Sequence, residues 1–187
     1  EFVGHRCLAR GLSDIAAMGG DPVAAFLSLA LPGKLPQSWV RAFFGGLLRM
    51  AQQHRVVLAG GDTAESPNGV LADIVVLGTV LRGQAILRSG ARPGDRIFVS
   101  GTLGGSAAAL MQMRTGRKNV DPRHFLRHFY PEPRIPLGRM LRERKIATAM
   151  SDTSDGLSTD LSHICDESGV GAEIYTTNIT RARVGRP

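Results

Sequence analysis

The sequence has few cysteines and no long apolar run, and each shortage excludes a class of protein. The two cysteines among 187 residues, Cys7 and Cys165, are too far apart for a metal-ligand spacing and too few for a disulfide framework. We expect both to be buried structural thiols in a reduced, cytoplasmic protein. No apolar run reaches the roughly 18 residues that suggest a membrane span, so no membrane partner is expected. Residues 1–10 form no signal peptide and lack an initiator methionine, which indicates a chain that begins inside a longer one.

Aromatic residues are also scarce, at 5% of the chain, whereas basic residues outnumber acidic ones by 23 to 16. The net charge of +7 favours anionic partners such as nucleic acids, acidic lipids or nucleotide phosphates. Proteins that bind single-stranded nucleic acids combine basic grooves with stacking aromatic side chains, and the sequence contains no recognition motif of a nucleic-acid-binding module. A non-catalytic nucleic-acid-binding module is therefore the less favoured alternative to an enzyme.

The first half of the chain alternates helical patterns with short apolar strands. Hydrophobic periodicity predicts helices over residues 4–19 and 36–54, and strands over residues 24–31, 55–59 and 71–81. The second of these strands is expected to leave the sheet at the turn-like motif GGDT, residues 60–63. This alternation indicates α/β or α+β architecture.

The second half resumes the alternation after a turn-rich boundary near residue 88. The pattern predicts strands over residues 96–100 and 171–176, helices over residues 106–114, 122–129, 134–143 and 157–167, a polar loop over residues 116–121, and a patternless tail from residue 177. We therefore predict two domains, over residues 1–87 and 88–187.

Acidic motifs stand at predicted strand or helix ends. Asp14 closes a Ser-Asp pair, Asp62 follows two glycines, and Asp152 and Asp155 share one short polar stretch. Carboxylates gathered from different segments can hold divalent cations, and such cations bridge nucleotide phosphates. Glycine beside an aspartate lets backbone N–H groups approach phosphate oxygens. Arg88, before a glycine-containing turn, can bind a phosphate through two N–H groups.

Each of these motifs also has a purely structural interpretation. Asp14 suits a polar helix face, and the GGDT motif is a common exit from a strand into a turn. Ser154 and Asp155 suit the N-cap of the helix predicted after them. Arg88 taken alone fits an ordinary solvated surface residue.

Two weaker motifs complete the candidates. The glycine-rich segment 101–105 follows a predicted strand, but it lacks the G-x-G-x-x-G spacing of dinucleotide-binding loops and has no Walker lysine. His124 and His128 lie four residues apart on one predicted helix, and we favour a solvated helix face over a metal site because no third ligand is apparent.

Taken in order, four segments resemble the thiamine-monophosphate kinase family of the aminoimidazole ribonucleotide synthetase superfamily. They are GLSDIAAMG (11–19), GGDT (60–63), RSGARPGD (88–95) and DTSDGL (152–157). The resemblance covers nearly the whole chain. It implies transfer of the γ-phosphoryl group of ATP directly to thiamine monophosphate, giving thiamine diphosphate, with several Mg²⁺ ions. The alternative within the superfamily is aminoimidazole ribonucleotide synthetase or a hydrogenase-maturation enzyme, which act on other acceptors.

The resemblance also implies residue roles and an architecture. It assigns metal binding to Asp14, Asp62, Asp152 and Asp155, ATP contacts to Gly61, Asp62, Arg88 and Ser154, and the transfer itself to Asp62, Arg88 and Asp155. It implies two α/β domains with mixed sheets flanked by helices, and a homodimer whose first-domain sheets form a barrel at the interface. The family's N-terminal aspartates and its C-terminal thiamine-pocket motif are absent from this sequence, which implies a fragment.

Overall fold

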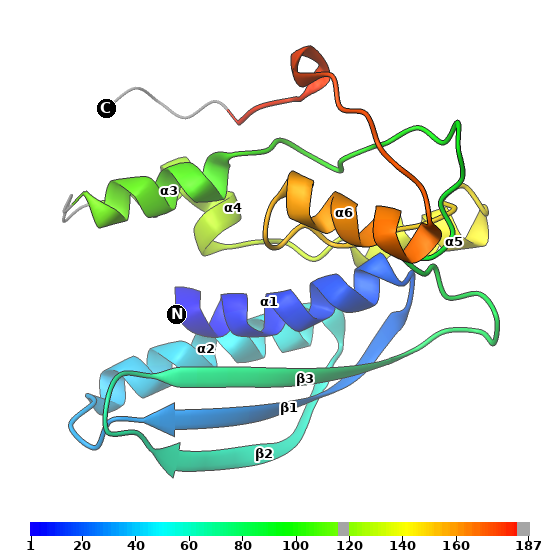
Figure 1. Ribbon diagram of the computed structural model, residues 1–187. Helices are drawn as coiled ribbons and strands as arrows, with labels where there is room; N and C mark the ends of the chain where they lie inside the picture. The colour runs from blue at the N-terminus through cyan, green and yellow to red at the C-terminus, as the bar shows by residue number, and fades with distance from the viewer. Residues whose placement is uncertain (116–119, 183–187) are drawn as a thin grey trace.

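The computed structural model, which describes residues 1–115 and 120–182, places two long helices against one face of a three-stranded sheet (Figure 1). The first half contains α1 (Phe2–Ala17), β1 (Asp21–Leu31), α2 (Gln37–His54), β2 (Val57–Glu65) and β3 (Leu71–Thr79). The second half contains α3 (Gly105–Arg114), the 3-10 helix η1 (Pro122–Phe125), α4 (Leu126–Phe129), α5 (Ile135–Glu143), α6 (Leu157–Ser168) and the 3-10 helix η2 (Thr176–Asn178). None of the helices in these described ranges is long and apolar enough to cross a membrane.

The sheet has the strand order β2-β1-β3 and is mixed, as predicted. The central strand β1 runs parallel to β2 and antiparallel to β3. Along β1 the side chains of Ala25, Leu27 and Leu29 are buried, whereas those of Phe26 and Ser28 between them are exposed. This period of two shows that one face of the sheet packs on the core and the other is open.

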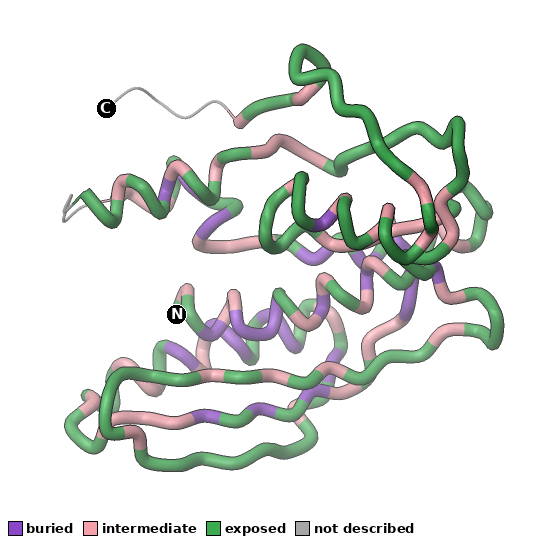
Figure 2. The backbone as a smooth tube through the Cα atoms, in the orientation of Figure 1, coloured by how far each residue is buried: buried purple, intermediate pink, exposed green. Residues whose placement is uncertain are grey.

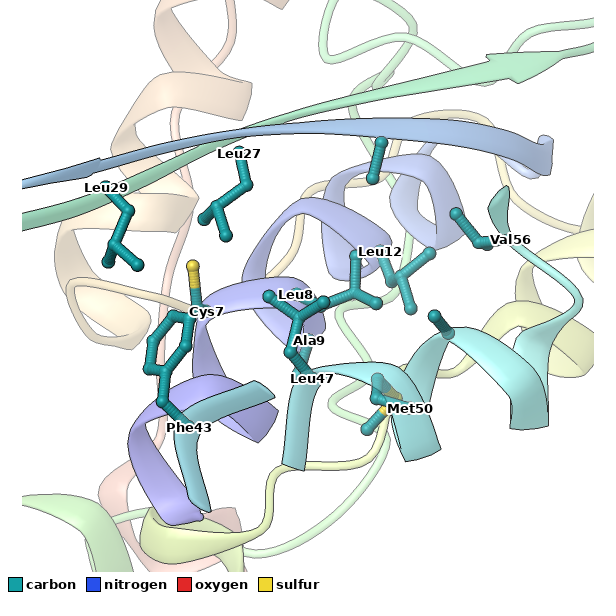
Figure 3. Close-up of a cluster of buried hydrophobic side chains, with 12 residues drawn as sticks. Cys7, Leu8, Ala9, Leu12, Leu27, Leu29, Phe43, Leu47, Met50 and Val56 are labelled. Carbon is teal, nitrogen blue, oxygen red and sulfur yellow. The ribbon is translucent and has the colours of Figure 1, made fainter. Parts of the chain in front are cut away.

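The hydrophobic core lies between that inner face and the two long helices (Figure 3). Its fully buried large side chains are Leu8 and Leu12 of α1 and Phe43, Leu47 and Met50 of α2. Their spacing of three or four residues is the helical periodicity that predicted both helices. Figure 2 shows the buried positions concentrated in the first half of the chain, while the second half is mostly exposed.

Two glycines let α1 and α2 approach to backbone contact. A Cβ atom on Gly46 would overlap the carbonyl group of Glu1, and one on Gly4 would overlap the carbonyl group of Phe43. A third close approach attaches the second half to the first, because a Cβ atom on Gly138 of α5 would overlap the carbonyl group of Ala16. In Figure 1 the helices of the second half accordingly lie over α1.

The strand β2 is longer than predicted. It does not end at GGDT but continues through that motif to Glu65, so the expected turn is wrong. Gly61 makes this continuation possible, because its φ of 148° is accessible mainly to glycine and a Cβ atom there would overlap the backbone of Leu27. The pairing of β1 with β2 is irregular just before this point, between Ala25 and Phe26.

Both strands predicted for the second half are wrong. Residues 96–100 and 171–175 form neither helix nor strand, and the 3-10 helix η2 begins at Thr176. The apolar side chains of residues 97–99 are exposed. A strand exists only when a neighbour satisfies its backbone hydrogen bonds, and no described segment pairs with either stretch.

The helices predicted for the second half are confirmed, with one of them divided. Residues 122–129 form η1 followed by α4 rather than one helix. The described part of the tail is attached to the second half, because Leu103 forms a parallel bridge with Arg181. Most of the predicted polar loop over 116–121, and the end of the tail after residue 182, lie outside the described residues.

For the two cysteines, and likewise for His124 and His128, the predicted environment is confirmed for one residue and wrong for the other. Cys7 is buried, which raises the pKa of its thiol to about 11, but Cys165 is only half-buried. His124 is exposed as expected. His128 is instead buried, and its Nδ1 atom lies 2.8 Å from the hydroxyl of Ser106, so a solvated face is wrong for this histidine.

Candidate functional site

A pocket of about 270 Å³ lies where three segments distant in sequence meet. The last turn of α1 contributes Asp14 and Ala17, followed by Met18 at the helix end. Residues 86–88, which follow β3, and residues 150–152, which precede α6, complete the lining. The pocket is therefore lined by residues of both halves of the chain.

Backbone hydrogen bonds fix these three segments to one another. The N–H group of Ile86 donates to the carbonyl oxygen of Met18 at 3.1 Å. The N–H group of Met150 donates to the carbonyl oxygen of Leu87, also at 3.1 Å. Since Ile86 is buried, the middle segment is attached to the protein by packing as well as by hydrogen bonds.

Three predicted site residues, Asp14, Arg88 and Asp152, line this pocket together. Asp14 and Arg88 are exposed and Asp152 is half-buried. Burial, followed by the negative charge of Asp14, raises the pKa of the Asp152 carboxyl group, while a hydrogen bond with Ser13 and the charge of Arg88 act in the opposite direction. Two carboxylates that repel each other beside a guanidinium group suit a divalent cation and an anionic phosphate bound together.

Asp62 and Gly61 lie elsewhere, on β2. The strand register pairs Asp62 with Ser28, whose side chain is exposed, so Asp62 lies on the sheet face that none of the described helices covers. Its carboxylate accepts a hydrogen bond of 2.9 Å from the N–H group of Thr63. Neither Asp62 nor Gly61 lines the pocket.

Ser154 and Asp155 lie in the loop between Asp152 and α6, and both are exposed and outside the pocket lining. Within residues 1–115 and 120–182, no three His, Cys, Asp or Glu side chains lie close enough together to hold a metal ion. Of the four aspartates assigned to metal binding, the structure thus brings together Asp14 and Asp152.

Sequence reasoning missed Asp160 as an organising residue of this loop. Its carboxylate is buried, and one oxygen, Oδ2, accepts hydrogen bonds from the N–H groups of Ser154 at 3.1 Å and Gly156 at 3.0 Å. Gly156 is the N-cap residue of α6, and no side chain caps the helix from that position. An acidic residue in the first turn that bonds backward to the N-cap was the available signal.

Family models for AIR synthase related proteins match both halves of the chain. The model of the N-terminal domain matches residues 1–80, and the model of the C-terminal domain matches residues 92–185. The chain therefore belongs to the AIR synthase related family. Its relatives in that family include thiamine-monophosphate kinases.

The thiamine-monophosphate kinase of Bacillus subtilis is 40% identical over 179 residues, which are 93% of this chain and 55% of the relative. The crystal structure of the enzyme from Stenotrophomonas maltophilia K279a matches with a TM-score of 0.88 and 39% identity, covering 98% of this chain and 59% of that one. A structure described as AaThiL complexed with AMPPCP and TMP matches with a TM-score of 0.80 and 34% identity, over 90% and 54% of the two chains. The chain thus spans between half and three fifths of the length of these relatives.

Proposed function

We propose that the chain carries the ATP- and Mg²⁺-binding part of an enzyme that phosphorylates thiamine monophosphate to thiamine diphosphate. The observation that carries this proposal is the convergence of Asp14, Arg88 and Asp152 from three segments on one pocket. Its support from relatives is about 40% identity to a thiamine-monophosphate kinase, and a similar structure described with AMPPCP and TMP.

The pocket residues suit phosphoryl transfer because this reaction depends on positioning and charge neutralisation rather than on covalent chemistry by the protein. The guanidinium group of Arg88 would bind phosphate oxygens of ATP through two N–H groups. The carboxylates of Asp14 and Asp152 would hold Mg²⁺, whose ligands in proteins are mainly oxygens. When bound, Mg²⁺ would neutralise the negative charge of the phosphates.

We further propose a homodimer formed through the open face of the sheet. Five large apolar side chains are exposed on this face: Phe26, Val57, Leu71, Val75 and Leu77. A second copy of the same sheet would cover them and build the barrel that the resemblance implies. Asp62 lies on this face too. It would therefore bind Mg²⁺ and ATP at the interface, with Gly61 beside it.

Ser154 and Asp155 are proposed as ATP and metal contacts from the loop before α6. Both side chains are exposed and therefore accessible to a ligand.

The domain boundary at residue 88 also stays a prediction, and the absence of helix and strand from residues 80–102 supports it. Cytoplasmic localisation stays a prediction from the cysteine content.

The test of the proposed activity is chromatographic detection of thiamine diphosphate after incubation of the chain with thiamine monophosphate, ATP and Mg²⁺. A form extended to the length of its relatives is assayed beside it, because the present chain covers 55% of the Bacillus subtilis enzyme. We expect product that requires both Mg²⁺ and ATP. Turnover of the acceptor of aminoimidazole ribonucleotide synthetase, with none of thiamine monophosphate, would contradict the proposal and favour the sister enzyme.

A further inference from the structure

Helix α6 carries two polar side chains that bond to the backbones of the two loops beside the pocket. Asp160, with 7% of its surface exposed, accepts hydrogen bonds from the N–H groups of Ser154 and Gly156. Ser168, at the other end of the helix, accepts a hydrogen bond of 3.1 Å from the N–H group of Ala91. Its hydroxyl donates one of 2.7 Å to the carbonyl oxygen of Arg88.

Each loop is attached immediately beside a charged pocket residue. The contact of Ser168 is with the backbone of Arg88 itself, and the contacts of Asp160 are two and four residues after Asp152. The two side chains lie eight residues apart on one rigid helix, a rise of about 12 Å. The helix therefore sets the distance between the backbone of the guanidinium-bearing residue and that of the carboxylate-bearing residue.

We infer that α6 is the positioning element of the proposed phosphate site, with Asp160 holding the loop of Asp152 and Ser168 holding the loop of Arg88. Neither Asp160 nor Ser168 lines the pocket, so both act through the residues that they position. The ligand in this inference, ATP with Mg²⁺, rests on the proposed function. The attachment of the loops does not depend on it.

The two bonds of Asp160 end on a single oxygen, and this makes the role of the side chain separable from its charge. Asn offers one carbonyl oxygen and can accept both bonds, whereas Ala offers none. If Asp160 works by holding the loop, Asp160→Asn should retain most of the function that Asp160→Ala loses. In the same way, Ser168→Thr keeps the hydroxyl and should retain most of the function that Ser168→Ala loses.

The first measurement is amide hydrogen exchange by NMR on the whole chain. Asp160→Ala should raise exchange about tenfold at Ser154 and Gly156 and leave Ala91 unchanged, because a lost hydrogen bond to a charged group costs at least that much protection. Ser168→Ala should raise exchange at Ala91 and leave exchange at Ser154 and Gly156 unchanged. Asp166→Ala and Ser162→Ala remove exposed side chains of the same helix, and they should change none of the three.

The second measurement is the affinity for ATP in the presence of Mg²⁺, by calorimetric titration. Loss of groups that orient metal ligands typically weakens binding by 10- to 100-fold, so we expect about a tenfold rise in Kd for Asp160→Ala and for Ser168→Ala. The Asn and Thr variants should stay within about threefold of the unmodified chain, as should the two exposed-site controls.

Each outcome decides a separate part of the inference. Unchanged exchange at Ser154 and Gly156 in Asp160→Ala, or at Ala91 in Ser168→Ala, would overturn the attachment of that loop. Raised exchange with unchanged affinity would overturn the positioning role. If the unmodified chain binds no ATP with Mg²⁺, the proposed function fails for this chain, and the exchange result still confirms or overturns the attachment. Should Asp160→Ala not fold, Ser168→Ala carries the test alone.

Discussion

At the scale of single residues, the environment of Asp152 opposes its own ionisation. Burial and the neighbouring Asp14 raise the pKa of its carboxyl group above the ordinary value of 3.8. A raised pKa in the folded chain means that the stabilisation is complete below pH 3.8 and is lost as the pH rises through the raised value. At neutral pH the ionised carboxylate therefore lowers the stability of the cation-free chain.

Asp152→Asn should consequently raise the Tm of the chain at pH 7 in the absence of divalent cations. At a pH below 3.8 the two proteins should have similar Tm values, because the carboxyl group is then neutral. Adding Mg²⁺ at pH 7 should stabilise the unmodified chain more than the variant, since binding to the folded state raises its Tm. Thermal unfolding with and without Mg²⁺ measures all three effects.

The matched control for this prediction is Asp166→Asn, which changes an exposed carboxylate on α6. It should reproduce the Mg²⁺ response of the unmodified chain. A lower Tm for Asp152→Asn at pH 7, or an equal Mg²⁺ response in Asp152→Asn and Asp166→Asn, would contradict Asp152 as a cation ligand whose ionised form is destabilised by its surroundings.

At the scale of elements, the close crossing of α1 and α2 depends on one of two adjacent glycines. A Cβ atom on Gly46 would overlap the carbonyl group of Glu1, whereas one on Gly45 would meet only the guanidinium group of Arg49, at 3.8 Å. Gly46→Ala should lower the free energy of unfolding by about 1–3 kcal/mol through overpacking. Gly45→Ala should raise it by about 0.5–1 kcal/mol, because alanine is the better helix former.

Urea unfolding of the two variants measures this difference directly. Since both substitutions add the same methyl group within one helix, helix propensity cancels between them. Equal stabilities would contradict the backbone contact between the helices.

The elements of the first half could be predicted because each carries its own hydrophobic period. Leu8 and Leu12 mark a helix by their spacing, and alternate burial marks β1 as a strand whose second face is open. The strand expected at 96–100 could not be judged in this way. Its residues have strand propensity, but pairing depends on a neighbouring segment that local sequence does not specify.

At the scale of the whole molecule, the open face of the sheet predicts self-association. Val75 lies in the centre of β3 with 54% of its surface exposed, on the same face as Phe26. We expect the chain to be dimeric at micromolar concentration in analytical ultracentrifugation. Val75→Lys should shift it to monomer, because a charge would be buried at the interface without a partner.

Leu126→Lys is the control for that experiment. Leu126 is equally exposed, at 55%, but lies on α4, away from the sheet. Its substitution should leave the dimer intact. A monomeric unmodified chain, or a Val75→Lys variant that stays dimeric, would contradict assembly through this face.

The candidate site could be predicted in part, because its charged residues stand in recognisable motifs whereas their meeting is a property of the tertiary structure. The motifs identified Asp14, Arg88 and Asp152, which line one pocket. They gave no sign that Asp62 lies away from the pocket, on the open face of the sheet, because that position follows from the register of β2 on β1. Asp160 was missed because its partners are backbone N–H groups, and its position in the first turn of α6 was the only sequence signal of that role.

The most direct test of the central claim is calorimetric titration of the chain with ATP, with and without Mg²⁺. We expect binding that requires Mg²⁺ and that weakens about tenfold or more in Arg88→Ala, because a lost charge-assisted bond to phosphate costs that much. Arg82→Ala, which removes an exposed arginine outside the pocket, should bind as the unmodified chain does. Binding of equal strength without Mg²⁺, or unchanged in Arg88→Ala, would contradict a magnesium–nucleotide site built from Asp14, Arg88 and Asp152.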